Sequence, residues 1–159
     1  MIQTDVLVIG GSATGLVAAM TAKSNYPDKS VTVIRKEEKV MIPCGIPYIF
    51  STVECSDNNV LPDGGLQKLG VEIIVGEVES VDTKAKQCTV KDGDSIQYDK
   101  LILGTGSLPS VPGWLKGADL ENVFTIPKNK TYLDELHQKL DGLEKVIVIG
   151  AGFIGVEVS

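Results

Sequence analysis

The stretch that decides the fold is DVLVIGGSATG, residues 5–15. Its apolar start, Asp5–Ile9, is typical of a strand that is buried on both faces of a parallel sheet. Gly10–Gly15 then predicts a tight turn, and the Ala-rich segment Leu16–Ser24 predicts a helix. VTVI at Val31–Ile34 supplies a second strand. This order is the βαβ unit of a Rossmann-type α/β fold.

A second glycine turn repeats the pattern farther along the chain. An amphipathic helix is predicted at Thr131–Leu140, and a buried strand at Val146–Ile149 runs into GAGFIG, Gly150–Gly155. This turn has the G-x-G-x-x-G spacing. Its first glycine makes the turn, Gly152 lets a pyrophosphate approach the backbone, and the last glycine lets the helix pack on its strand. Two such turns indicate two bound nucleotides.

The first turn departs from that spacing, because Ser12 stands where the second glycine is expected. Serine is small, so a pyrophosphate can still approach, and its hydroxyl can donate a hydrogen bond. The acidic residue usual about 20 positions later is also missing. Arg35 and Lys36 stand there instead. A base at this place would stack on adenine or meet phosphate, and a solvated charge run is an equally good interpretation of RKEEK.

Between the two turns the hydrophobic period changes. Val71–Val75, Ser80–Val90 and Ser95–Leu103 predict an antiparallel meander inserted in the nucleotide fold, with a hairpin turn at Lys91–Asp94. The Gly- and Pro-rich residues 104–113 predict a crossover to a second domain.

Composition and charge narrow the class of protein. The chain has 159 residues, 43% of them hydrophobic and 23% charged, with a net charge of -6. We expect no nucleic-acid partner and no membrane partner, because an acidic chain is not drawn to either and no apolar run approaches the roughly 20 residues of a membrane span. We also expect a cytoplasmic protein, because Asp5 and Gly10-Gly11 interrupt the apolar start that a secretion signal would need. We expect no metal site, since three cysteines and one histidine fit neither a disulfide framework nor a zinc site.

One cysteine, Cys44, lies in the segment PCGIP, residues 43–47. If a helix starts here, the sulfur sits at its positive end, which stabilises a thiolate. An inert buried cysteine is the alternative, but PCGIP has no evident packing role between two elements. We predict that Cys44 is the reactive residue and that Cys55 and Cys88 are structural or incidental.

Four motifs in this order resemble the pyridine nucleotide–disulfide oxidoreductase family, and the resemblance covers essentially the whole chain. VLVIGGSATGLVAA resembles the family's FAD-binding start, and GVEIIVGEVESVD resembles the strand that borders adenine. LILGTGSLPSVPG is similar to the second flavin motif, and VIVIGAGFIGVEV to the NAD(P)H-binding turn.

The resemblance implies an FAD-binding domain at residues 1–112 and the beginning of an NAD(P)H-binding domain at residues 113–159. The residues that it implies for the cofactors are Gly10, Gly11, Ser12, Ala13, Thr14, Gly15, Arg35, Lys36, Val78, Thr105 and Gly106 for FAD, and Gly150, Gly152, Phe153, Ile154, Gly155 and Glu157 for NADH or NADPH.

The cysteine pattern indicates a branch of the family. Dithiol members carry C-x4-C, but the residue five after Cys44 is Ile49. PCGIPY instead resembles the single-cysteine branch, which contains coenzyme A disulfide reductases, NADH oxidases and peroxidases, and sulfur or persulfide reductases. Oxidases and peroxidases usually have a histidine in the first turn, where this chain has Ala13, so the resemblance favours a disulfide or sulfur reductase.

The activity implied by the resemblance is electron transfer from NAD(P)H through FAD to a small disulfide, persulfide or sulfur substrate at Cys44, in a homodimeric parent protein. One alternative is an NADH oxidase that reduces O2. Another is a nucleotide-binding fragment without turnover, since the later FAD segment and the dimerisation domain of the family are not in this sequence.

Overall fold

The computed structural model describes residues 1–159, and the chain divides into two compact units. Unit 1 comprises Met1–Lys39 and Leu61–Gly106, and unit 2 comprises Val40–Val60 and Ser107–Ser159. The segment 40–60 thus belongs with the C-terminal part of the chain. The predicted FAD-binding range 1–112 is therefore distributed over both units.

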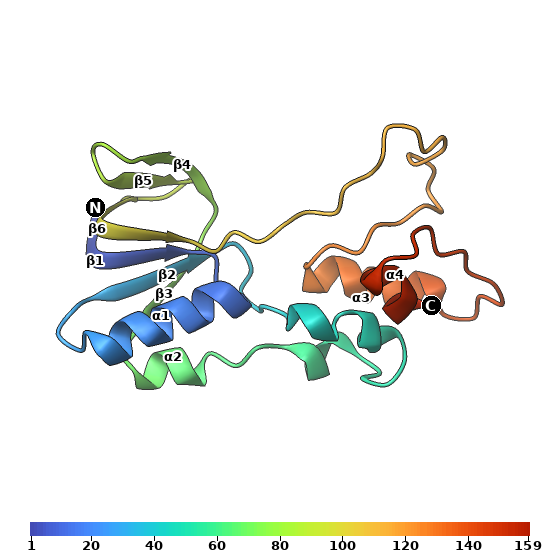
Figure 1. The fold of residues 1–159 in the computed structure, drawn as a ribbon, viewed down its shortest axis with the longest axis horizontal. Coiled ribbons are helices and arrows are strands. Elements are labelled where there is room, and N and C mark those ends of the chain that lie inside the picture. Colours follow the sequence, from blue (N-terminus) through green and yellow to red (C-terminus); the bar gives the residue numbers. More distant parts are fainter. The chain divides into compact units, whose positions relative to one another are not determined.

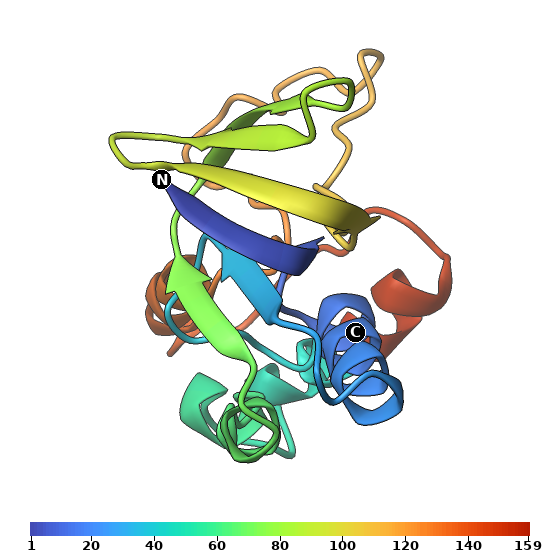
Figure 2. The same ribbon diagram turned by 90° about the vertical axis from the view of Figure 1, so that its left-hand side faces the viewer.

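A six-stranded sheet forms the centre of unit 1, with the strand order β3-β2-β1-β6-β5-β4 (Figure 2). Its strands are β1 (Ile2–Ile9), β2 (Val31–Arg35), β3 (Glu72–Val75), β4 (Val78–Asp82), β5 (Gln87–Val90) and β6 (Ser95–Leu103). β1 pairs in parallel with β2 and β6, and β2 pairs in parallel with β3. β4, β5 and β6 pair antiparallel. The predicted α/β class, a parallel nucleotide-binding sheet with an antiparallel meander, is confirmed.

Both faces of the central strand β1 are buried at its carboxyl end, which explains why residues 6–9, VLVI, are all apolar. Val8 packs with residues of α1 (Ala13–Asn25) and α2 (Gly64–Lys68), among them Ala19 and Leu66. Leu7 packs on the opposite face with side chains of β5 and β6, including Cys88. Figure 1 shows both helices on one side of the sheet. Each fully buried aliphatic side chain of this core contributes roughly 1.5–3 kcal/mol.

The meander differs from the prediction in two respects. β3 does not belong to it, because β3 pairs in parallel with β2 at the edge of the sheet. The predicted stretch Ser80–Val90 is two strands joined by a turn. There the Asp82 carboxylate accepts hydrogen bonds from the backbone N–H groups of Lys84 and Ala85, both at 2.8 Å. That turn has no Gly, Pro or Asn, so Ser80–Val90 lacks the residues that mark a turn most strongly.

Unit 2 is built from two α-helices and three short 3-10 turns, and it contains no β-strand. Its elements are η1 (Pro43–Gly45), η2 (Pro47–Phe50), η3 (Ser56–Asn59), α3 (Lys130–Leu140) and α4 (Phe153–Val158). The predicted helix α3 begins after Asn129, whose side chain accepts a hydrogen bond from Tyr132 N at 2.9 Å. Leu133 and Leu136 on its buried face pack with Ile49. No helix in the chain combines the length and the apolar character that a bilayer crossing requires.

The predicted strand Val146–Ile149 is wrong for this structure. These residues form neither helix nor strand, and their side chains are between 38% and 87% exposed. A strand needs a neighbour for its backbone N–H and C=O groups, and unit 2 offers only an isolated bridge between Met41 and Val60. The apolar run is therefore present without the partner strands that would bury it.

Candidate functional site

The first glycine turn follows directly on β1, where three backbone segments meet closely. Gly10 has a φ of +104°, and a β-carbon there would lie 2.1 Å from the carbonyl oxygen of Gly104. Gly10 N donates to the Ile34 oxygen at 2.8 Å, and Gly104 N donates to the Ile9 oxygen at 2.8 Å. No side chain fits between these segments, so glycine is required at residue 10.

The rest of the turn brings the start of α1 close to β1. A β-carbon at Gly15 would lie 1.7 Å from the Gly10 oxygen, so only glycine permits this packing. Ser12 has a φ of -87° and an extended backbone, which any residue adopts. The structure thus explains why serine can replace the second glycine of the motif.

The turn fits the pyrophosphate of a dinucleotide. α1 has 13 residues, no acidic residue in its first turn, and no side chain that caps its first N–H groups. Those N–H groups have no acceptor within the helix, and together with the helix dipole they favour a bound anion. Ala13 and Thr14 are exposed at this end, so they leave the approach open.

The second glycine turn has the same local geometry in unit 2. Gly150 has a φ of +122°, and a β-carbon at Gly155 would lie 1.9 Å from the Gly150 oxygen. Gly152 precedes α4 with an extended backbone, as Ser12 precedes α1. The other residues predicted to contact the nicotinamide nucleotide, Phe153, Ile154 and Glu157, are exposed on α4.

Arg35 is the last residue of β2 and is only 6% exposed. Its Nη1 and Nη2 atoms bind the two carboxylate oxygens of Asp63 at 2.6 and 2.7 Å, and Nη2 also donates to the Glu38 oxygen at 2.6 Å. The hydrogen bonds from Arg35 lower the pKa of the Asp63 carboxyl. The solvated-run interpretation is therefore wrong for Arg35, and its charge is already neutralised by a carboxylate.

Asp63 is the residue of this region that the sequence reasoning missed. It stands in Pro62-Asp63-Gly64, which reads as an ordinary turn before a helix. Nothing in the local pattern relates it to Arg35, which lies 28 positions earlier. Only the fold shows that the two side chains meet.

The remaining residues predicted to contact FAD also lie in unit 1, and they differ in burial and in their hydrogen-bond partners. Lys36 is exposed, and its Nζ lies 3.0 Å from Glu77 Oε1. That hydrogen bond raises the pKa of Lys36 and lowers the pKa of Glu77. Val78 opens β4 and is partly buried against the core of the sheet, while Thr105 and Gly106 are exposed just after Gly104.

Cys44 lies exposed in η1, and the backbone around it is held by Asn59. Asn59 is 3% exposed, and its Nδ2 donates to the Ile42 oxygen at 3.0 Å. Ile42 N donates in turn to the Asn59 oxygen at 2.9 Å. A β-carbon at Gly45 would lie 1.9 Å from Asn59 Oδ1. The glycine after the cysteine therefore makes room for the amide that fixes the loop.

The expected helix at Cys44 is only a three-residue 3-10 turn followed by η2. So short an element has little aligned dipole, and the reason given above for a stabilised thiolate is therefore wrong. The alternative of a buried Cys44 is wrong as well, because the side chain is exposed. Cys55 is half-buried and Cys88 is buried, and burial raises the pKa of the Cys88 thiol.

The two glycine turns and the exposed Cys44 occur in a chain that matches a known protein family. Residues 4–159 match the family described as pyridine nucleotide-disulphide oxidoreductase. The chain belongs to this family. The members of this family that resemble the chain are NAD(P)H-dependent flavoprotein oxidoreductases. The family resemblance noted in the sequence is thereby confirmed.

Individual members of the family are similar over nearly the whole chain. The NAD(P)H sulfur oxidoreductase (CoA-dependent) of Pyrococcus abyssi is 33% identical over 99% of this chain and 36% of its own length. The NADH oxidase of Methanocaldococcus jannaschii is 33% identical over 96% of this chain and 36% of its own length. The solved structure of an NAD-dependent persulfide reductase from A. fulgidus is 31% identical, with a TM-score of 0.84, over 97% of this chain and 31% of that one. The chain thus spans about a third of the length of these relatives.

Proposed function

We propose that this chain is the FAD- and NAD(P)H-binding part of an oxidoreductase that reduces a disulfide, persulfide or sulfur substrate through Cys44. The observation that carries the proposal is the exposed thiol of Cys44, which forms no disulfide. Asn59 holds the backbone beside it through the hydrogen bond to the Ile42 oxygen, and the chain belongs to a family of oxidoreductases. The relatives named as sulfur and persulfide reductases support the same substrate class.

The two glycine turns supply the nucleotide sites in this proposal. The turn Gly10–Gly15 would hold the FAD pyrophosphate, with the first N–H groups of α1 as donors. The turn Gly150–Gly155 would hold the pyrophosphate of NADH or NADPH at the start of α4. When bound, the flavin supplies the exchange of two electrons between the nicotinamide and sulfur.

Cys44 would act as the nucleophile toward the substrate. Its thiolate attacks one sulfur of a disulfide RSSR, a Cys44–S–S–R bond forms, and RS⁻ leaves and takes a proton from solvent. Two electrons that come from NAD(P)H, with one proton, then cleave that bond, which releases a second RSH and restores the thiolate. The sum is RSSR, NAD(P)H and H⁺ giving two RSH and NAD(P)⁺.

A second candidate is an NADH oxidase with O2 as acceptor, in which Cys44 passes through a sulfenic acid. The relative from Methanocaldococcus jannaschii with that name supports it. Ala13, exposed at the start of α1, argues against it, because its side chain offers no proton donor for oxygen reduction.

The test measures NAD(P)H oxidation by the purified native chain in the presence of FAD. One assay offers coenzyme A disulfide or polysulfide under argon, and a second offers O2 as the only acceptor. We expect anaerobic turnover with a sulfur substrate, and we expect Cys44→Ser to abolish it while FAD stays bound. Turnover with O2 alone would favour the oxidase. A purified chain that retains FAD but turns over neither acceptor would be a nucleotide-binding fragment. If the Cys44→Ser variant reduced the sulfur substrate as fast as the native chain, the proposed role of Cys44 would be wrong.

A further inference from the structure

The end of β2 carries a base, where dinucleotide-binding folds usually carry an acid. The base does not stand alone, since Arg35 binds both oxygens of Asp63 at 2.6 and 2.7 Å. Asp63 comes from a different element, directly before α2, and its side chain is 29% exposed. The buried arginine thus holds a partly exposed carboxylate at the end of the strand.

We propose that Asp63, held by Arg35, binds the hydroxyl groups of the adenosine ribose of FAD. This inference rests on the proposed function, because it needs FAD at the first glycine turn. A carboxylate offers about four acceptor positions, of which the bidentate arginine uses two. Two positions remain for the two O–H donors of a ribose.

The pair lies beside the turn proposed for the pyrophosphate. The Cδ atom of Arg35 lies 2.6 Å from where a β-carbon on Gly11 would stand, so Gly11 is the residue that admits the arginine. α1 and α2 both begin at the end of the sheet where β1 and β2 finish (Figure 1). The ribose is the next group along a dinucleotide from the pyrophosphate, so the carboxylate is near the place where it is needed.

Charge and hydrogen bonding at the pair favour a hydroxyl over a phosphate. The accessible part of the pair is the carboxylate, since the Asp63 side chain is 29% exposed and Arg35 is only 6% exposed. A ribose hydroxyl can donate a hydrogen bond to this carboxylate, whereas a phosphate only accepts hydrogen bonds and would be repelled by it in direct contact. The Arg35 cation offsets the charge of Asp63, so the pair does not repel the neighbouring pyrophosphate.

The experiment compares ADP with 2′,3′-dideoxy-ADP as competitors for the FAD site, with flavin fluorescence as the readout. In the native chain we expect loss of the hydroxyls to weaken binding roughly tenfold or more, as for hydrogen bonds to a charged group. In Asp63→Asn the two competitors should bind within about threefold of each other. Arg35→Lys should reduce the discrimination as well, because lysine cannot hold the carboxylate at two points.

Asp5→Asn is the matched control, since it removes a carboxylate of the same unit that pairs with Lys29 and does not contact Arg35. It should discriminate between the competitors as the native chain does. Equal binding of the two competitors by the native chain overturns the inference, even if Asp63→Asn fails to fold. Native-like discrimination in a folded Asp63→Asn also overturns it. A native chain that binds neither FAD nor ADP instead overturns the proposed function on which it rests.

Discussion

At the residue scale, the three cysteines differ in how the fold surrounds them. Cys44 is exposed in a loop that Asn59 fixes, Cys55 is half-buried, and Cys88 lies in the core of the sheet. A thiol reacts as its thiolate and only where a reagent can reach it. The fold therefore separates one accessible sulfur from two shielded ones.

We predict that iodoacetamide labels Cys44 first, Cys55 more slowly and Cys88 last. Burial raises the pKa of the Cys88 thiol and also blocks access to it, so it should stay unlabelled until the chain unfolds. Peptide mapping by mass spectrometry over a time course gives the order, and labelling in urea shows that all three can react. Labelling of Cys88 as fast as Cys44 in the folded chain would contradict the structure.

The glycine next to Cys44 can be tested by its size alone. Gly45→Ala would place a β-carbon 1.9 Å from Asn59 Oδ1, so the amide must move away from the loop. We expect the free energy of unfolding to fall by roughly 1–3 kcal/mol, as for other overpacked sites. Gly113→Ala, where nothing lies within 4 Å, is the control in the same unit and should change it little. Urea denaturation measures the free energy of unfolding of both variants. If the two substitutions reduced it by similar amounts, a clash with Asn59 could not be the cause.

At the scale of elements, the glycine turns Gly10–Gly15 and Gly150–Gly155 share the same backbone conformation, although only the first of them follows a strand. The turn is determined by positive φ and by close packing within six residues, so the glycine pattern alone predicts it. A strand also needs neighbours for its backbone groups. The apolar run Val146–Ile149 has none in its unit, and there the prediction failed.

The same distinction explains what else could be predicted. β1, α1, β2 and α3 follow from apolar periodicity and Gly or Pro signals, which are local. The parallel pairing of β3 with β2 and the contact of Arg35 with Asp63 join residues distant in sequence, and no local pattern encodes them. The segment PCGIP draws attention to Cys44 as a candidate, whereas Asn59, which fixes its loop, lies in a polar stretch that carries no such motif.

The first turn offers a contrast between two of its positions. Gly15→Ala would place a β-carbon 1.7 Å from the Gly10 oxygen, so α1 must move away from β1. We expect a loss of roughly 1–3 kcal/mol in stability and weaker FAD retention. Ser12→Gly should change stability by a few tenths of a kcal/mol only, because Ser12 has an extended backbone and caps no amide. Thermal unfolding and flavin fluorescence measure both effects, and equal effects of the two substitutions would refute this account of the motif.

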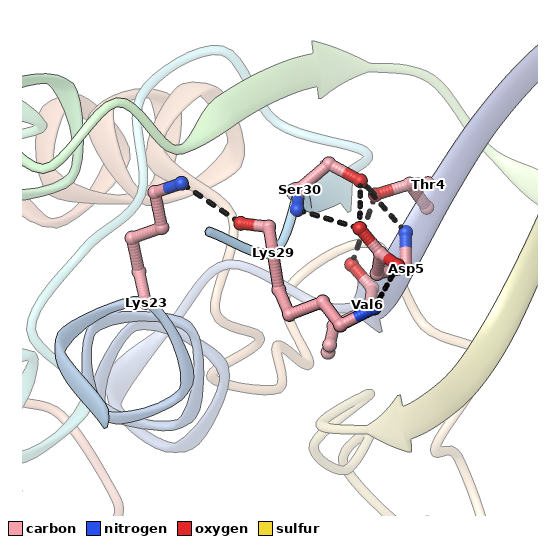
Figure 3. Close-up of polar contacts among 6 residues, drawn as sticks. All are labelled: Thr4, Asp5, Val6, Lys23, Lys29 and Ser30. Atoms are coloured by element: carbon pink, nitrogen blue, oxygen red, sulfur yellow. Dashed lines mark hydrogen bonds and ion pairs between the residues drawn. The ribbon is translucent and has the colours of Figure 1, made fainter. Parts of the chain in front are cut away.

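At the scale of the whole molecule, a polar cluster within unit 1 joins the middle of β1 to the residues that precede β2. Asp5 accepts hydrogen bonds from Lys29 Nζ and from the backbone and hydroxyl of Ser30, each at 2.8 Å (Figure 3). Lys23 donates to the backbone oxygen of Lys29 at 2.8 Å, which links the end of α1 to the same place. The hydrogen bond from Lys29 is the main reason that the pKa of Asp5 is lowered from 3.8 to about 2.

This lowered pKa predicts how stability changes in acid. A carboxylate whose pKa is lower in the folded chain stabilises it above the unfolded value and loses that effect as pH falls through the folded value. The contribution of Asp5 should therefore be present above pH 3.8, decrease below it, and be lost as pH falls through about 2. We expect native and Asp5→Asn chains to differ in unfolding midpoint near neutral pH and to converge as pH approaches 2. A difference that stays constant over this range would show that Asp5 stabilises by some means other than its charge.

The Arg35–Asp63 pair has a consequence for how such a protein can evolve. The chain leaves unit 1 after Lys39 and returns at Leu61, and the ion pair joins the stretches on either side of this excursion. A chain in which a short Gly/Ser linker replaces residues 40–60 should keep the circular dichroism of the sheet. Arg35 and Asp63 both lie outside residues 40–60, so substitutions within that segment leave the ion pair at its two ends intact. Exposed positions of the segment, such as Cys44, can therefore change over time while the end of the sheet beside the first glycine turn keeps its structure.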